Sequence, residues 1–369
     1  MRIAMLGHKR IPSREGGVDV VVGELAVRMA KLGHDVTCYN RKGHHVSGKE
    51  FDTLPLEVFH GVRLKTAPAI DIKGLAAMTA SVFASVFAAF GRYDVVHFHT
   101  EGPCVTLWLP KLLGKRCVVT VHGLDHQRSK WGRFARAYIL LGEKVAAKWA
   151  DEIIVLSKNV QDYFKQTYGR ETRFLPNGVT QVEKKPAELI CREYALEKDG
   201  YILYLGRITP EKGIHYLIEA FKNLNTDKKL VIAGGASDSQ AYFEEIKASA
   251  ADDSRILFTG FVQGQMLEEL YSNAYVYVLP SDLEGMPLSL LEAMSYGNCC
   301  VVSDVPECTE VVGSMGLVFS KGNVQELAKL LEQVCDDAEL VTGYKNGAAG
   351  YINSCYSWDD VTEKTLELY

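Results

Sequence analysis

The sequence predicts an α/β protein made of two successive domains, each built on a doubly wound parallel sheet. Three observations lead to this prediction. A chain of 369 residues is long enough for two domains. Short apolar runs alternate with helical stretches, as they do in parallel sheets that helices cover on both faces. The alternation pauses at a polar stretch near residue 180 and then restarts, so we expect domains at 1–180 and 181–354.

The first half begins with a βαβ unit. Arg2–Leu6 is an apolar run that we expect to form a strand, and Asp35–Tyr39 is rich enough in β-branched residues for a second strand. Between them, Val18–Leu32 carries apolar residues at helical spacing. Further strands are expected at 94–98, 117–121 and 152–156, and further helices at 103–114 and 131–150.

One segment of the first half allows two interpretations. Gly74–Phe90 holds seventeen residues without a charge, which is just under the length that spans a bilayer. Because it is rich in alanine and serine, we expect a helix packed against the sheet. A helix embedded in a membrane or lying on it is the alternative.

The second half repeats the alternation of strands and helices. The turn at 176–178 is followed by the polar stretch 179–189, which we expect to be the interdomain linker. Strands are expected at 201–205, 229–233, 256–258, 274–279 and 299–302, and helices at 212–224, 240–250, 264–272, 287–296 and 323–335. The last segment, about 355–369, is expected to be helical. It could pack on either domain, and we assign it to the first.

Charge and cysteine content narrow the class of protein. The net charge of −5 hides a division, because residues 1–180 carry a net charge of +10 and residues 181–369 one of −15. Opposed halves indicate domains in different electrostatic settings. The nine cysteines form no CxxC pair, so we expect buried, reduced thiols rather than a metal site or a disulfide framework. The N-terminal residues lack the features of a signal peptide.

The strongest candidate for chemistry is the segment 282–297. Glu284 lies in the loop after an expected strand, a helix starts near Pro287, and Glu292 lies inside that helix. The N-terminus of a helix favours a phosphate, and carboxylates next to it can accept hydrogen bonds from sugar hydroxyls and a ribose diol. The alternative is one surface glutamate and one ordinary glutamate of a first helical turn.

The second candidate is the segment 204–214, which also follows a strand and opens a helix. Arg207 and Lys212 could clamp a diphosphate between a guanidinium fork and a point charge. A lysine at a helix start is mildly unfavourable unless an anion lies nearby. The alternative is a solvated surface pair between Lys212 and Glu211.

Two weaker candidates lie in the first half. Gly16 and Gly17 precede a helix and would let a ligand approach the backbone, although a plain turn explains them equally well. They do not form the GxGxxG pattern that a nicotinamide-dependent oxidoreductase would show. His122 follows a strand, where its side chain could donate a hydrogen bond to a sugar hydroxyl or its backbone carbonyl could support a developing oxocarbenium charge. A purely structural role is the alternative. His97, His99 and Glu101 are weaker candidates still.

These motifs together resemble family 4 glycosyltransferases, the retaining group with the GT-B fold. The segment EGMPLSLLE matches the E-x7-E signature of the family, and LGR-x4-KG appears as Leu205–Gly213. The Gly-Gly loop, the strand-end HG and the PNG turn occur in the expected order, so the resemblance spans nearly the whole chain. Within the family, the sequence resembles bacterial enzymes of surface-polysaccharide assembly, including rhamnosyltransferase-like members.

The resemblance implies a fold and a role for each motif. It implies two Rossmann-like domains that face each other across a cleft, an N-terminal one for the acceptor and a C-terminal one for the nucleotide-sugar donor. Arg207 and Lys212 would bind the donor diphosphate, Glu292 the ribose and Glu284 the transferred sugar. The remaining implied contacts are the backbone around Gly285, Met286, Pro287 and Leu288 for sugar and phosphate, Gly16 and Gly17 for phosphate, His122 for the sugar near the reacting carbon, and Phe261 and Val262 for the base. Met286-Pro287 departs from the commoner Phe-Gly of the family.

The resemblance also implies the reaction and its partners. It implies a hexosyltransferase that moves a sugar to an acceptor hydroxyl with retention of configuration and needs no metal or cofactor. The acceptor would be a saccharide or a lipid-diphosphate-linked saccharide. We expect a cytoplasmic protein, peripheral at the inner face of the membrane, with no nucleic-acid partner.

A basic segment supports the expected membrane contact. Residues 115–148 contain eight Lys and Arg residues interleaved with aromatic ones, which is typical of a surface that binds anionic lipid. An exposed, solvated helix face explains the same pattern. As alternatives to a transferase, we keep a GT-B sugar-nucleotide epimerase or phosphorylase and a non-catalytic sugar-nucleotide-binding protein.

Overall fold

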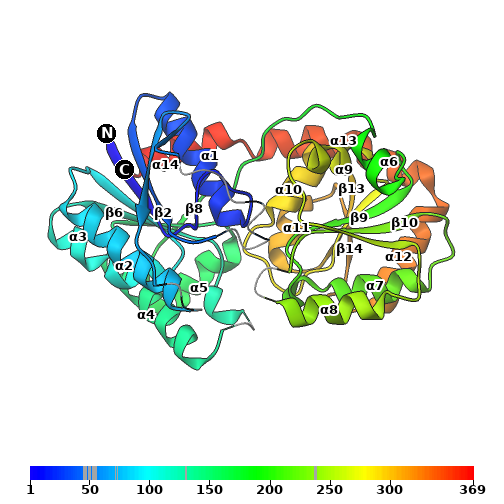
Figure 1. Ribbon diagram of the computed structural model, residues 1–369, viewed down its shortest axis with the longest axis horizontal. Helices are drawn as coiled ribbons and strands as arrows, with labels where there is room; N and C mark the ends of the chain where they lie inside the picture. Colours follow the sequence, from blue (N-terminus) through cyan, green and yellow to red (C-terminus); the bar gives the residue numbers. More distant parts are fainter. Residues whose placement is uncertain are drawn as a thin grey trace. The chain divides into compact units, whose positions relative to one another are not determined.

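The chain folds into two compact units in the computed structural model. The structure describes residues 1–44, 48, 51, 56–70, 72, 74–128, 131–236 and 239–369. The N-unit consists of Met1–Gly178 and Trp358–Tyr369, and the C-unit of Val179–Ser357 (Figure 1). The chain thus passes from the N-unit to the C-unit after Gly178, two residues before the expected boundary at 180.

The N-unit is built on an eight-stranded sheet with the strand order β3-β4-β2-β1-β5-β6-β7-β8. All neighbouring strands are parallel except β3 and β4, which are antiparallel. The inner strands β1, β5 and β6 are buried almost throughout because helices cover both faces. The strands are β1 (Arg2–Leu6), β2 (Asp35–Arg41), β3 (Val58–Phe59), β4 (Val62–Ala67), β5 (Val95–His99), β6 (Arg116–Val121), β7 (Glu152–Val155) and β8 (Arg173–Phe174).

Two helices from opposite ends of the chain cover one face of this sheet. Helix α1 (Gly17–Lys31) packs against α14 (Trp358–Glu367), and Nε of Arg28 donates to Oδ1 of Asp359 at 2.9 Å. The end of the chain is held by Arg116, whose Nε donates to the carbonyl of Leu368 at 2.8 Å. The final segment therefore belongs to the N-unit.

Four helices cover the other face of the N-unit sheet. They are α2 (Leu75–Phe90), α3 (Trp108–Leu112), α4 (Arg133–Trp149) and α5 (Lys158–Tyr168). Helix α2 packs small side chains, Ala80, Ala84 and Ala88 among them, against the sheet, as its alanine-rich sequence predicts. No helix among the described residues is both long enough and apolar enough to cross a membrane.

The continuous helix predicted for 103–114 is wrong. Gly102–Thr106 forms a 3-10 turn instead, and a short helix, α3, follows it. Pro110 has no N–H to donate to the carbonyl of Thr106, so the regular hydrogen-bond ladder fails at this point.

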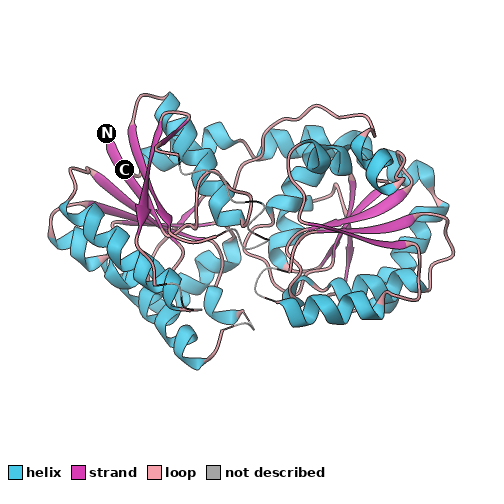
Figure 2. Ribbon diagram, viewed as in Figure 1, coloured by secondary structure: helices cyan, strands magenta, loops and turns pink. Residues whose placement is uncertain are grey.

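The C-unit is built on a six-stranded, fully parallel sheet with the order β11-β10-β9-β12-β13-β14 (Figure 2). The chain winds outward from β9 in one direction and from β12 in the other, so the switch point lies between these strands. The strands are β9 (Tyr201–Leu205), β10 (Lys229–Ala233), β11 (Ile256–Gly260), β12 (Val276–Leu279), β13 (Cys299–Ser303) and β14 (Leu317–Phe319). The helices are α6 (Leu189–Tyr194), α7 (Ile214–Lys222), α8 (Gln240–Ser249), α9 (Gln265–Asn273), α10 (Leu288–Ser295), α11 (Pro306–Val312), α12 (Val324–Asp336) and α13 (Ala338–Cys355).

The polar stretch 179–189 packs on the C-unit, which corrects its prediction as a linker. The backbone N–H of Val179 donates to the carbonyl of Tyr356 at 3.0 Å, and that of Lys185 donates to Oγ of Ser272 at 2.9 Å. The sequence could not show this, because the contacts come from residues about 90 to 180 positions away.

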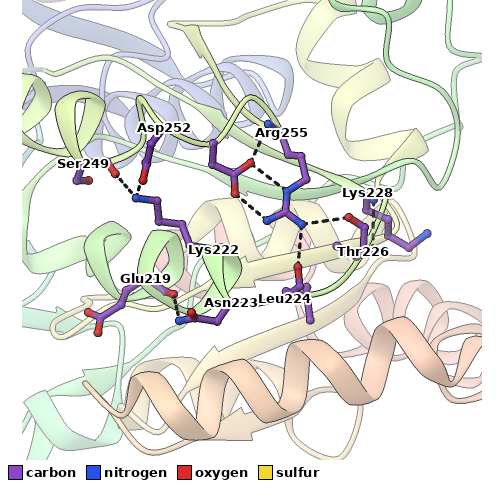
Figure 3. A network of polar contacts seen from close by, with 10 residues as sticks. Glu219, Lys222, Asn223, Leu224, Thr226, Lys228, Ser249, Asp252 and Arg255 are labelled. Atoms are coloured by element: carbon purple, nitrogen blue, oxygen red, sulfur yellow. Dashed lines mark hydrogen bonds and ion pairs between the residues drawn. The ribbon is translucent and has the colours of Figure 1, made fainter.

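A polar network closes the N-terminal edge of the C-unit sheet (Figure 3). Nη1 of Arg255 donates to the carbonyls of Leu224 and Thr226, and Nη2 pairs with Asp253 at 2.7 Å. Nζ of Lys222 pairs with Oδ1 of Asp252 at 2.5 Å. These contacts fix the loops that enter β10 and β11. They lie at the amino ends of the strands, opposite the carboxyl ends where ligands bind in sheets of this kind.

Helix α4 approaches the loop after β5 so closely that Gly142 has no room for a side chain. A Cβ at Gly142 would lie 2.0 Å from the carbonyl oxygen of Glu101, whereas one at Gly23 in α1 would meet only a methyl of Ile11 at 3.9 Å. We expect Gly142→Ala to lower the free energy of unfolding by about 1–3 kcal/mol through overpacking. Gly23→Ala should instead raise it by about 0.5–1 kcal/mol, because alanine favours the helix. Urea denaturation of both variants tests this, and equal stabilities would contradict the close approach.

Candidate functional site

The loop after β9 places Arg207 at the switch point of the C-unit. The hydroxyl of Tyr204 donates to the carbonyl of Arg207 at 2.8 Å, and that of Tyr277 donates to the carbonyl of Leu205 at 3.2 Å. Both tyrosines are buried, so the backbone that carries Arg207 is fixed from the core. In doubly wound sheets, ligands bind at this edge, outside the carboxyl ends of the strands.

Lys212 lies in a separate turn before α7, which corrects its predicted place in the first turn of a helix. Pro210–Lys212 forms a 3-10 turn, and α7 begins only at Ile214. Gly213 separates the two with a φ of +64°, and a Cβ there would lie 2.0 Å from the carbonyl oxygen of Pro280. Only glycine suits this left-handed conformation and close approach. The turn that carries Lys212 is therefore pressed against the end of β12.

This approach brings Lys212 and Glu284 into a buried ion pair. Nζ of Lys212 lies 2.5 Å from Oε1 of Glu284, and the two side chains are only 14% and 6% exposed. The same oxygen accepts a hydrogen bond of 2.6 Å from the hydroxyl of Ser281, which follows β12. Two residues that the sequence singled out separately thus form one charge centre.

Glu211 is buried, so the solvated surface pair with Lys212, which was the alternative interpretation, is wrong. Its side chain is buried, and neither carboxylate oxygen has a hydrogen-bond partner among the described residues. Its backbone carbonyl accepts from the N–H of Asp282 at 2.9 Å, which ties the two loops together. This burial could not be predicted from the sequence, because it depends on the loop after β12, about 70 residues further along the chain.

Glu292 lies one turn into α10, close to the same edge. The hydroxyl of Tyr271 donates to Oε2 of Glu292 at 3.3 Å and lies 3.2 Å from the carbonyl of Ser289. The predicted segment Gly285, Met286, Pro287 and Leu288 leads from Glu284 into this helix, with Pro287 as its N-cap. Arg207, Lys212, Glu284 and Glu292 are thus gathered around the ends of β9 and β12.

Phe261 and Val262 lie apart from this group. They follow β11, which β10 separates from β9, so they occupy the same edge of the sheet two strands away. Gly234, after β10, lies between them and the switch point. Its φ is +150°, and a Cβ would lie 1.8 Å from the carbonyl oxygen of Gly206. The glycine pair after an expected strand was a signal that sequence reasoning did not use.

In the N-unit, Gly16 and Gly17 open helix α1. The backbone of Gly16 is extended, and a Cβ there would meet only Oδ2 of Asp19 at 3.6 Å. Oδ1 of Asp19 accepts from the N–H of Lys9 at 2.7 Å, which holds the preceding loop against the helix. Burial raises the pKa of Asp19 to about 6. The fold leaves room at Gly16, so the protein's own packing does not require a glycine there.

His122 follows β6 and contacts another histidine. Its Nε2 lies 3.0 Å from Nδ1 of His99. Burial lowers the pKa of His122 to about 4 and that of His97 to about 3, so both rings are neutral at physiological pH. His97, His99 and Glu101, the weaker candidates, are all buried. No hydrogen bond in the described part of the chain joins His122 to Gly16 or Gly17.

A pocket of about 270 Å³ lies at the carboxyl edge of the N-unit sheet. Its walls are mostly apolar and come from α2 and α4, and its polar groups come from the loops after the strands. The lining includes Met78, Ala84, Tyr138, His8, Asp125 and Trp131. An apolar pocket with a few polar groups suits a small molecule or part of a larger one.

Two doubly wound parallel-sheet units make up the GT-B fold, as in the similar solved structures, which confirms the predicted fold class. The family models place the chain among the glycosyltransferases of this fold. More particularly, the chain belongs to the family 4 glycosyltransferases. The model of Glycosyltransferase Family 4 matches residues 15–181, and that of Glycosyl transferases group 1 matches residues 188–351. The resemblance drawn from the motifs is thereby confirmed.

Named relatives include enzymes that act on different substrates. The chain is 27% identical to alpha-maltose-1-phosphate synthase of Mycolicibacterium smegmatis, over 100% of this chain and 99% of that protein. It is 29% identical, over 69% and 70% of the two chains, to an Escherichia coli UDP-Gal:alpha-D-GlcNAc-diphosphoundecaprenol alpha-1,3-galactosyltransferase. The structure of Anabaena HepE in complex with UDP and glucose matches with a TM-score of 0.82 at 17% identity, covering 100% of this chain and 98% of that one.

The buried Asp19 should make stability depend on pH. A carboxyl with a folded-state pKa near 6 and an unfolded-state value near 3.9 binds more protons when folded, so stability falls as pH rises from about 4 to 6. Asp19→Asn removes this titration and can keep the hydrogen bond from Lys9. We expect the stability of the variant, relative to the wild type, to rise by roughly 3 kcal/mol across this window. Urea denaturation at pH 4 and pH 7 measures the difference, and a constant difference would contradict the burial of a titrating carboxyl.

Proposed function

We propose that this protein transfers a sugar from a nucleotide-diphosphate sugar to an acceptor hydroxyl, with retention of configuration and without a bound metal. The observation that carries this proposal is the Lys212–Glu284 pair at the switch point, beside Arg207 and the start of α10. In this proposal the C-unit, predicted from the sequence as 181–354, binds the donor, and the N-unit, predicted as 1–180, binds the acceptor.

The chemistry follows from the charges at this edge. As the bond from the anomeric carbon to the phosphate oxygen breaks, Arg207 and Lys212 stabilise the negative charge on the departing diphosphate. The acceptor oxygen bonds to the same face of that carbon, and its proton passes to an oxygen of the diphosphate. No protein base is needed, and configuration is retained.

The ion pair suggests how donor binding and sugar recognition are linked. Without a ligand, Lys212 neutralises Glu284. A diphosphate that attracts the ammonium of Lys212 leaves the carboxylate of Glu284 able to accept hydrogen bonds from sugar hydroxyls. Glu292 would accept from the ribose, Phe261 and Val262 would contact the base, and Gly285–Leu288 would hold sugar and phosphate. The family resemblance assigns two further contacts with the donor, from Gly16 and Gly17 to the phosphate and from His122 to the sugar.

Removing either charge of the pair should abolish transfer. We expect Lys212→Ala and Glu284→Gln to fold but to release no nucleoside diphosphate in the presence of acceptor. Lys222→Ala, which breaks an ion pair at the opposite edge of the same sheet, should keep wild-type activity (Figure 3). Thermal stabilisation by UDP-, GDP-, ADP- and dTDP-sugars identifies the donor first, and the matching sugar should bind Lys212→Ala roughly tenfold or more weakly.

Wild-type turnover in either site variant would overturn the assignment. Conversion of the donor into another nucleotide sugar, without net release of nucleoside diphosphate, would favour an epimerase. Formation of a sugar phosphate from a saccharide and inorganic phosphate would favour a phosphorylase, and donor binding without any conversion would favour a non-catalytic binding protein.

We further propose that the acceptor is lipid-linked and that the N-unit lies on the inner face of an anionic membrane. Helix α2 supports this, because it buries its small residues and exposes its large ones. Phe83, Phe87 and Phe90 are exposed, Phe90 to 74%. A helix that merely packs on a sheet shows the opposite distribution. The diphosphoundecaprenol in the name of one relative is a substrate of the same chemical kind.

The neighbouring helices extend this apolar surface and make it basic. Helix α2 packs against α3, and α3 against α4 (Figure 1). These three helices supply nine of the 17 exposed large apolar side chains among the described residues, whereas the C-unit supplies only Val318.

The only carboxylate of these three helices, Glu143, is buried and accepts from the hydroxyls of Tyr163 and Tyr168. The charged groups at their surface are cations: Lys111, Arg133, Arg136, Lys144 and Lys148. Lys130, part of the basic segment in the sequence, lies outside the described residues.

Sedimentation with vesicles tests the membrane contact. We expect the wild type to bind phosphatidylglycerol-rich vesicles at low salt and less so at high salt, because cations attract anionic headgroups. Phe90→Ser with Phe134→Ser should weaken binding by roughly tenfold or more, since both side chains would leave the apolar layer. Val318→Ser is the matched control and should change nothing. Absence of binding at both salt concentrations would contradict the membrane proposal. It would leave the proposed transferase activity unaffected.

A further inference from the structure

Three histidines of the N-unit touch one another at the ends of β5 and β6. The rings of His97 and His99 lie 4.2 Å apart between centroids and are tilted by 31°. Nδ1 of His99 lies 3.0 Å from Nε2 of His122. His97 and His99 are fully buried, and His122 is 8% exposed, so this row runs from the core to the edge of the sheet.

The inner end of the row is fixed on both sides. Nδ1 of His97 lies 2.6 Å from the hydroxyl of Tyr369, and Nε2 lies 2.7 Å from the hydroxyl of Thr120. Tyr369 follows α14 and packs edge-on against the ring of His97. The ring of His99 therefore packs against a ring whose two nitrogens are both hydrogen-bonded.

The bond between His99 and His122 can run in two directions. Because burial keeps both rings neutral, each carries one N–H, and one of the two nitrogens in contact must donate to the other. The remaining nitrogen of His99, Nε2, is enclosed and has no partner among the described residues. If His122 donated, that nitrogen would carry a buried N–H without an acceptor. Such orphaned donors are rarer than under-satisfied acceptors in folded proteins, so donation by His99 is favoured.

His8 shows the same rule in the same unit. Asn40 is oriented by Ile11, whose N–H donates to Oδ1 and whose carbonyl accepts from Nδ2. Oδ1 is therefore an acceptor, and Nε2 of His8, at 3.0 Å from it, must be the donor. The other nitrogen of His8, Nδ1, is enclosed without a partner in the described part of the chain, and it carries no proton.

We propose that His99 is a positioning residue: it donates from Nδ1 to Nε2 of His122 and so fixes His122 as the tautomer with its proton on Nδ1. Among the described residues, Nδ1 of His122 forms no hydrogen bond and is not enclosed. His122 then presents a single N–H at the edge of the sheet, where it can donate to a ligand oxygen but cannot accept from a hydroxyl. That this oxygen belongs to a sugar rests on the proposed function, whereas the tautomer does not.

Nitrogen NMR of the unliganded, full-length protein with ¹⁵N-labelled histidine tests the tautomer directly. At neutral pH we expect Nδ1 of His122 and Nδ1 of His99 to show pyrrole-like shifts and the Nε2 of each ring to show pyridine-like shifts. The variants His122→Gln and His99→Asn assign the signals by their loss. A pyridine-like Nδ1 in His122 would overturn the proposal, whatever the enzyme transfers.

Two substitutions of His99 then separate positioning from packing. The Nδ2 group of asparagine can take the place of Nδ1, so His99→Asn should keep the tautomer of His122, whereas His99→Leu should lose it. Once the donor is known, we expect His99→Leu to lower kcat/KM by roughly tenfold and His99→Asn much less. Equal losses in both variants with an unchanged His122 tautomer would show that His99 only fills space. A missing transfer activity in the wild type would reject the proposed function and leave the NMR result standing.

Discussion

The buried contact between Lys212 and Glu284 is the interaction on which the candidate site depends. Taking two charges out of water is costly, and a single member left alone would cost several kcal/mol. The pair exists because Gly213 lets one loop press against the end of β12, where Ser281 adds a hydrogen bond to the carboxylate. Backbone geometry at one glycine thus determines the electrostatics of the whole edge. Such a pair is a weak source of stability but a responsive one, since an anion can replace one partner.

The N-unit shows a different compromise between packing and exposure. Helix α2 lies close to the sheet because its inner face consists of alanine and serine, and this displaces its aromatic side chains to the surface. In water this arrangement leaves large apolar side chains in contact with solvent. Soluble monomers rarely expose large contiguous patches of this kind. Burial of Phe83, Phe87 and Phe90 would contribute favourable free energy only if another surface covered them. The helix is thus better suited to an interface than to bulk solvent.

The sequence predicted the central strands well and the peripheral elements poorly. Strands such as β1 and β9 are continuous apolar runs, which follows from burial on both faces. The two-residue strands β3 and β8 carry no such pattern. Helix α13 was missed because its glycines at 343, 347 and 350 lower helix propensity, and burial of Val341, Ala348 and Ile352 compensates only in the folded unit.

The candidate site was predictable residue by residue but not as an arrangement. Position after a strand was enough to single out Arg207, Lys212 and Glu284. Their pairing, the burial of Glu211 and the contact between His99 and His122 depend on loops that meet only in three dimensions. Sequence spacing shows which residues can reach an edge of the sheet, and tertiary packing decides which of them touch.

The return of α14 to the N-unit has a consequence for how the chain is assembled. The C-unit is one uninterrupted segment, Val179–Ser357, whereas the N-unit is completed only by Trp358–Tyr369. As the chain leaves the ribosome, the C-unit is available to fold while the N-unit still lacks α14 and the hydroxyl that holds His97. The half of the molecule that is made first is thus the half that is finished last. Its histidine row reaches its final state only when Tyr369 arrives.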